Sequence, residues 1–170
     1  MYHAKRGGGG QGISVWGEGT STRPIGAHWV RHVLDRGLLR LYCQPILHLA
    51  SGRIDRYELL LRIVEGDQVF SPEPFIQEAE RQGLIWEVDR WVISEAARLL
   101  RRPASQASHL AVHIDLHINL SAQTLFSQRL LDVIREEMQG LPSWEGRLVL
   151  ELLETSPLAD LEEERRRMLE

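Results

Sequence analysis

An acid and a base stand four residues apart in an otherwise apolar run, the segment YELLLR at residues 57–62. A charge inside a buried strand is costly unless a partner neutralises it. Glu58 offers a carboxylate, a hard oxygen donor suited to Mg²⁺, Mn²⁺ or Ca²⁺. Arg62 offers a guanidinium that can bind a phosphate through two parallel hydrogen bonds. The pair therefore predicts a cation site beside a phosphate group.

Two further oxygen donors follow at the ends of later predicted strands. Asn119 closes one such strand and Glu151 closes the next. In a barrel of alternating strands and helices, reactive residues gather at the carboxyl ends of the strands. Two carboxylates and an amide oxygen suit a hard divalent cation and suit a soft metal poorly. With Arg62, this set predicts a metal-assisted phosphoester site.

Each of these residues also has an ordinary structural interpretation. Glu58 can pair with Arg56 or Arg62 at a strand edge, and Asn119 can cap the helix that follows it. Glu151 and Glu154 can be solvated acids at a strand end. The functional interpretation is favoured because three oxygen donors coincide at the ends of predicted strands. These donors are Glu58, Asn119 and Glu151.

The elements that must position these residues alternate between strands and helices. Strands are predicted at residues 39–49, 54–64, 110–121 and 147–154, and helices at 27–39, 75–83, 85–100, 125–140 and from 158 onward. The run at 54–64 is nearly continuous in apolar residues, as in a strand covered on both faces. The alternation predicts an α/β fold with a largely parallel sheet. Four βα units make half of an eight-stranded barrel, which usually needs about 250 residues.

Composition excludes several other classes. The 170 residues carry a net charge of −4, which does not favour a nucleic-acid polymer as partner. Cys43 is the only cysteine, so no intramolecular disulfide forms and a cytoplasmic location is expected. The first residues do not resemble a signal peptide, and no apolar run approaches the roughly 20 residues that span a bilayer. Residues 1–25 are rich in Gly, Ser and Thr and are predicted to be a tail or linker.

Several segments in order resemble the EAL domain family of cyclic di-GMP phosphodiesterases. The signature Glu-x-Leu-x-Arg matches Glu58, Leu60 and Arg62. The resemblance runs from about residue 35 to 165, and the other segments that carry it are YCQPILHLASGRI, SPEPFIQEAERQGLIWEVDRWVISEA, INLSAQTL and LVLELLETS. Residues 26–170 therefore look like the N-terminal part of an EAL domain, a partial (β/α)₈ TIM-like barrel.

The resemblance implies an activity and a set of roles. It implies a domain that opens cyclic di-GMP to linear pGpG with two Mg²⁺ or Mn²⁺ ions, which activate a hydroxide and stabilise charge on the phosphate. By position, the metal ligands would be Glu58, Asn119 and Glu151. The substrate-binding residues would be Arg62, Gln44 and Leu60, and Glu154 would orient a ligand.

Other parts of the family's machinery have no counterpart in this sequence. An aspartate pair that binds metal and a lysine that assists the attacking water would follow the fourth strand, so the general base is expected beyond residue 170. The chain is therefore expected not to hydrolyse cyclic di-GMP unaided. The segment MYHAKRGGGGQ resembles the end of a GGDEF domain, which often precedes an EAL domain.

Alternatives remain open at this point. A degenerate EAL module that senses cyclic di-GMP without cleaving it is one, favoured by Leu153 where the family has a threonine. A scaffold that interacts through an open sheet edge is another, and the complete domain could form a homodimer.

The segment HIDLHIN places His113, Asp115, His117 and Asn119 on one side of a strand. Residues two apart on a strand step by about 6.6 Å, so a polar strand face is expected there instead of a separate transition-metal site.

Overall fold

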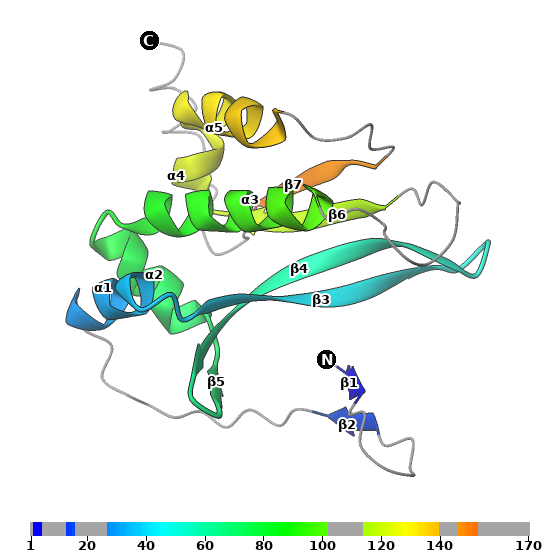
Figure 1. The fold of residues 1–170 in the computed structure, drawn as a ribbon, viewed down its shortest axis with the longest axis horizontal. Coiled ribbons are helices and arrows are strands. Elements are labelled where there is room, and N and C mark those ends of the chain that lie inside the picture. The colour runs from blue at the N-terminus through cyan, green and yellow to red at the C-terminus, as the bar shows by residue number, and fades with distance from the viewer. Residues whose placement is uncertain (1, 5–12, 16–26, 102–113, 140–145, 153–170) are drawn as a thin grey trace.

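The computed structural model describes residues 2–4, 13–15, 27–101, 114–139 and 146–152 (Figure 1). In the described residues, seven strands and five helices follow one another along the chain. They are β1 (Tyr2–Ala4), β2 (Ile13–Val15), α1 (Ala27–Asp35), β3 (Leu39–His48), β4 (Arg53–Glu65), β5 (Gln68–Phe70), α2 (Glu73–Arg81), α3 (Ile85–Arg101), β6 (Asp115–Leu120), α4 (Ala122–Leu125), α5 (Arg129–Met138) and β7 (Leu148–Leu152).

The main sheet has five strands. Four of them lie in the order β3-β4-β6-β7, and the fifth, β5, pairs with the C-terminal end of β4. β4, β6 and β7 run parallel to one another, and each connection between them carries two helices. β3 and β4 instead form a long antiparallel hairpin, with Leu39 opposite Ile63 and His48 opposite Arg53. β6 is therefore an interior strand with a parallel neighbour on each side.

Helices pack against one face of this sheet. Figure 1 shows α3, α4 and α5 gathered over β6 and β7, with α1 and α2 near the start of β3. One core cluster joins α1, α2 and α3 to the β3–β4–β5 end of the sheet and is centred on Phe75 and Ile63, both fully buried. The other joins α3 and α5 to β6 through Ile118 and Leu120. The apolar face of each helix is buried here, as its period of about 3.6 residues predicts.

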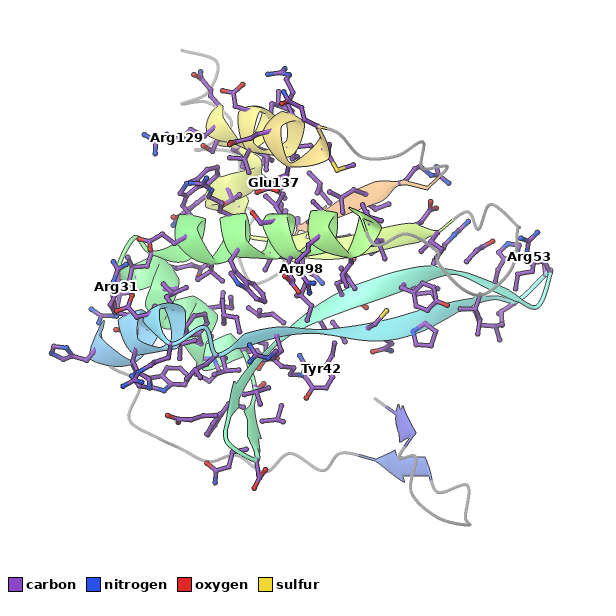
Figure 2. All side chains as sticks on the ribbon, viewed as in Figure 1. Arg31, Tyr42, Arg53, Arg98, Arg129 and Glu137 are labelled. Carbon is purple, nitrogen blue, oxygen red and sulfur yellow. The ribbon has the colours of Figure 1, made fainter. Side chains whose placement is uncertain are left out.

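Successive side chains of a strand point to opposite faces, which gives the sheet a second face of different character. Leu59 and Ile63 of β4 belong to the helix-covered core, so Glu58 and Arg62 lie on the other face. Tyr42 of β3, whose Cα pairs with that of Leu60, lies on the side of β3 that faces away from α3 (Figure 2). We call this the open face of the sheet, because the described helices pack on the other side.

The predicted class, an α/β fold forming part of a TIM-like barrel, is confirmed, and the differences are local. β4, β6 and β7 are parallel, but β3 and β5 each pair with β4 in the antiparallel sense. The four residues between β3 and β4 and the two between β4 and β5 are too few for a parallel crossover. The run at residues 54–64 is covered by described helices on one face only. The helix expected at residues 125–140 is α5, Arg129–Met138. The short helix α4 before it and the strand β5 were not predicted. β1 and β2 pair with each other inside the predicted tail.

Some predictions lie outside the described residues. They concern Glu154, His113, the helix from residue 158 onward and the glycine run at residues 7–10. None of the helices in the described segments has the length and apolar character that crossing a membrane requires.

Candidate functional site

Strand register brings the predicted donors onto neighbouring positions of the open face. Gln44 of β3 pairs with Glu58 of β4, and Glu58 pairs with His117 of β6. Two residues further along, Asn119 of β6 pairs with Glu151 of β7. Paired residues of adjacent strands project to the same face. The three predicted metal ligands thus lie on three adjacent strands and on one side of the sheet.

Asn119 contacts the carboxylate of Glu58 directly. Its Nδ2 donates a hydrogen bond of 2.9 Å to Glu58 Oε1, and both side chains are partly buried. The contact runs diagonally from β6 to β4, because the residue level with Glu58 on β6 is His117. The ordinary interpretation gave Glu58 an ion pair with Arg56 or Arg62. Within the described residues, the carboxylate of Glu58 accepts from Asn119, and Arg56 lies 3.9 Å from Asp55 Oδ1.

Glu151 is held by a residue for which the sequence predicted no such role. His117 Nδ1 lies 2.6 Å from Glu151 Oε1, and the two side chains are 16% and 41% exposed. This contact is also diagonal, from β6 to β7. Side chains of β6 therefore hold both candidate carboxylates, one on each neighbouring strand. Strand alternation placed His117 on this face, but only the register shows which neighbour it contacts.

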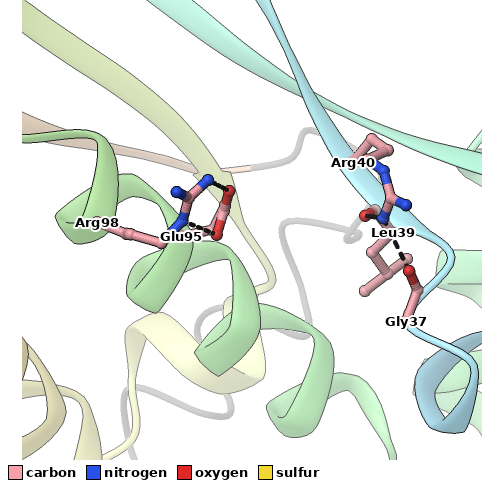
Figure 3. A network of polar contacts seen from close by, with 5 residues as sticks. All are labelled: Gly37, Leu39, Arg40, Glu95 and Arg98. Atoms are coloured by element: carbon pink, nitrogen blue, oxygen red, sulfur yellow. Dashed lines mark hydrogen bonds and ion pairs between the residues drawn. The ribbon is translucent and has the colours of Figure 1, made fainter. Parts of the chain in front are cut away.

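The predicted substrate residues lie on the same face, along β4 and β3. Leu60 and Arg62 follow Glu58 at alternate positions of β4, and Gln44 is exposed across from Glu58 on β3. Arg62 pairs in register with Arg40. The guanidinium of Arg40 turns back onto the carbonyl oxygens of Gly37 and Leu39, at 2.7 and 2.6 Å (Figure 3). A second basic residue is therefore level with Arg62 in the sheet, with its guanidinium held at the start of β3.

A buried carboxylate fixes the end of β6. Asp89 of α3 is 2% exposed, and its Oδ2 accepts hydrogen bonds from the backbone N–H of Ser121 at 3.1 Å and from its hydroxyl at 2.6 Å. Ser121 in turn caps α4, because its Oγ accepts from the Thr124 N–H at 3.2 Å. Burial raises the pKa of Asp89 above its ordinary value, and the bonds from Ser121 oppose that shift. The segment just after Asn119 is thereby anchored to α3.

The row of polar residues along β6 does not converge on one ion. Asp115 forms an ion pair with Arg147 at 3.2 Å, while His117 contacts Glu151 and Asn119 contacts Glu58. Over the described ranges, no three His, Cys, Asp or Glu side chains group so as to hold a metal ion. The described side chains of this row thus form a polar strand face in which each contacts a different partner.

The donors nevertheless fit a divalent cation in their chemistry. Among the described residues, hydrogen bonds occupy one oxygen of each carboxylate and the amide nitrogen of Asn119. Three hard oxygen donors remain on this face: Glu58 Oε2, Glu151 Oε2 and Asn119 Oδ1. Six or more ligands are usual for such ions, so these residues form one side of a metal site that further donors must complete.

Known proteins share these segments. The model of the EAL domain family matches residues 27–170. The cyclic di-GMP phosphodiesterase NbdA of Pseudomonas aeruginosa is 35% identical over 113 residues, which are 65% of this chain and 14% of that protein. The bifunctional diguanylate cyclase/cyclic di-GMP phosphodiesterase MucR of the same species is 30% identical over 136 residues, 78% of this chain and 19% of that protein.

The solved structure of the PaMucR phosphodiesterase in complex with c-di-GMP has the same fold. It is 27% identical with a TM-score of 0.62, and the match covers 84% of this chain and 58% of that one. The chain thus spans less than a fifth of the length of the two curated relatives. The family match covers every predicted site residue and confirms the resemblance that the motifs carry: the chain belongs to the EAL domain family.

Proposed function

We propose that this chain supplies one side of the active site of a cyclic di-GMP phosphodiesterase, which hydrolyses the dinucleotide to linear pGpG with divalent metal ions. The observation that carries the proposal is the contact between Glu58 and Asn119, with Glu151 in register beside Asn119 on the same face. Relatives named as cyclic di-GMP phosphodiesterases support the choice of substrate.

Each residue has a role that follows from its chemistry and place. Glu58, Asn119 and Glu151 would hold Mg²⁺ or Mn²⁺ through the oxygens that their mutual hydrogen bonds leave over. A metal ion bound there would supply an activated water and offset charge on the phosphate. Arg62 would bind a phosphate of the substrate in bidentate fashion, and Arg40 is a second basic residue level with it in the sheet. Gln44 and Leu60 would border the bound nucleotide, and Glu154 would orient a metal ligand.

The proposal extends to the setting of the reaction. Because the general base and the remaining metal ligands are not assigned within these 170 residues, the chain alone is expected to release no pGpG. Residues 26–170 form the EAL part and residues 1–25 a tail, with a preceding GGDEF domain as part of the same hypothesis. A cytoplasmic location and a homodimer formed through the complete domain belong to it as well.

A receptor that binds cyclic di-GMP without cleaving it is the alternative. Leu153, where the family has a threonine, favours it because the hydroxyl of that threonine is missing from this sequence. The two functions differ in their need for metal. Binding that persists without a divalent cation favours the receptor, and binding that depends on one favours the enzyme.

Calorimetric titration of the full chain with cyclic di-GMP, with and without Mg²⁺, tests the proposal. Glu58→Gln keeps the shape of the side chain but removes its charge, and a loss of affinity of at least tenfold is expected. Glu136→Gln on the exposed side of α5 is the matched control and should bind as the wild type does. Equal binding by Glu58→Gln and the wild type would show that Glu58 holds no metal.

A further inference from the structure

His117 occupies the centre of the candidate site without an assigned role. Its Cα lies level with that of Glu58 on one side and that of Val149 on the other. Its side chain is only 16% exposed, and Nδ1 lies 2.6 Å from Glu151 Oε1. An imidazole so placed is part of the polar face that carries the metal donors.

The two ring nitrogens of His117 have different surroundings. Nδ1 faces the Glu151 carboxylate, whereas Nε2 is buried and has no hydrogen-bond partner within the described segments. A carboxylate oxygen can only accept, so the hydrogen of this contact must lie on Nδ1. A hydrogen on Nε2 would be a buried, unsatisfied donor, which is expensive. The geometry therefore selects the tautomer in which Nδ1–H donates to Glu151 and Nε2 carries a lone pair.

This contact limits where the Glu151 carboxylate can lie. Glu151 stands on a five-residue strand, and its side chain is 41% exposed. An exposed glutamate normally samples many rotamers. The bond from His117 fixes one oxygen toward β6, and the other oxygen is then left for a ligand next to Asn119, whose Cα pairs with that of Glu151. Ligating carboxylates are commonly held by such hydrogen bonds.

We propose that His117 is a positioning residue for the metal site, acting through Glu151. The inference rests on the proposed function, because it assigns His117 to the same site. Partners of this kind typically change metal affinity by about 10- to 100-fold when they are removed. His117 itself need not touch the cation or the substrate.

The test measures Mn²⁺ binding to the full chain, from the loss of the free-ion signal in electron paramagnetic resonance. His117→Leu keeps bulk and removes the donor, so a loss of affinity of about 10-fold or more is expected. His117→Asn places an amide N–H close to the position of Nδ1 and should recover much of the affinity. His48→Leu, in the exposed end of β3, is the control and should bind like the wild type. Thermal melting of each variant separates a binding effect from a folding effect.

A second readout does not depend on metal. Nitrogen-15 shifts of the His117 ring, measured at a pH where the ring is neutral, should show the hydrogen on Nδ1, and Glu151→Gln should change them. Unaltered Mn²⁺ affinity in folded His117→Leu, or a ring hydrogen on Nε2, would overturn the inference. If the wild type binds no Mn²⁺, the proposed function fails, and the ring shifts alone then decide whether His117 holds Glu151. If His117→Leu does not fold, His117→Asn and the ring shifts decide.

Discussion

Removing the buried carboxylate of Asp89 should loosen the end of β6 on which Asn119 stands. The replacement Asp89→Ala leaves the N–H and the hydroxyl of Ser121 buried without their acceptor, since both now donate to Asp89 Oδ2. Each unsatisfied group costs about 1–3 kcal/mol. Relief from burying a charge offsets part of this cost. A net loss of about 2–4 kcal/mol in the free energy of unfolding is therefore expected, a large share of the about 5–15 kcal/mol typical of a domain.

Urea denaturation followed by circular dichroism measures this loss. The matched control is Asp132→Ala on α5, because Asp132 is 77% exposed and its pair with Arg135 lies within one exposed helix. Such pairs contribute little to stability. Hydrogen exchange should also show that the amide of Ser121 exchanges faster in Asp89→Ala. If Asp89→Ala and Asp132→Ala are equally stable, the anchoring of β6 to α3 is not a stabilising contact.

The raised pKa of Asp89 adds a dependence on pH with a definite sign. Burial makes the folded protein hold this proton more tightly than the unfolded chain does. The resulting contribution to stability is fully present below the ordinary pKa of about 3.9 and is lost as pH rises through the raised value. Asp89→Asn lacks this titration, so its stability deficit relative to the wild type should shrink as pH rises from about 4. A deficit that grows with pH would show that the hydrogen bonds outweigh burial.

Three further predictions concern the ligand, the metal and the core. Arg62→Ala should lower the affinity for cyclic di-GMP about tenfold or more, because a charged hydrogen bond is lost. Calorimetry measures the change, and Arg98→Ala, which breaks the exposed pair with Glu95 in Figure 3, is the control that should bind as the wild type does. Chelation by EDTA should abolish binding of cyclic di-GMP to the wild type, and unchanged binding would favour the receptor. Phe75→Ala should lower the free energy of unfolding by about 3–5 kcal/mol in a urea titration. The ring of Phe75 is fully buried, and its centroid lies 5.6 Å from that of Trp29. A loss under about 1 kcal/mol would contradict that packing.

The antiparallel pairing of β3 and β4 could have been inferred from loop length. Four residues, 49–52, join the two strands, and Gly52 has a φ of +65° in that turn. A parallel pair needs a crossover of a dozen or more residues, so the short connection leaves only a hairpin. Alternation of strands and helices elsewhere in the chain predicted a parallel sheet, and that prediction is confirmed for β4, β6 and β7.

β5 was missed because it is only three residues long and has no period of its own. Gly66 and Asp67 form the two-residue connection between β4 and β5, with Gly66 at a φ of +59°. Gly followed by Asp between two strands is a recognised hairpin signal. Here the signal was present in the sequence, but the strand that follows it, Gln68–Phe70, was too short to be noticed.

The candidate site could be predicted in its members but not in its contacts. Motif spacing identified Glu58, Asn119 and Glu151, and alternation along β6 identified the face of His117. The diagonal contacts depend on the register between strands that are 34 and 61 residues apart in sequence at the bonded positions. A shift of one residue in register would turn every such side chain to the other face, and only tertiary packing fixes it.

The geometry of the site depends on β6 more than on either carboxylate strand. β4 and β7 each bring one acid, but both acids are bonded to side chains of β6, through Asn119 and His117. The apolar side chains on the other face of β6 are locked into the core by α3 and α5, with Ile118 and Leu120 fully buried. Asp89 then anchors Ser121, the residue that directly follows β6. Because the core and the site share this one strand, a substitution that shifts β6 should move both carboxylates together.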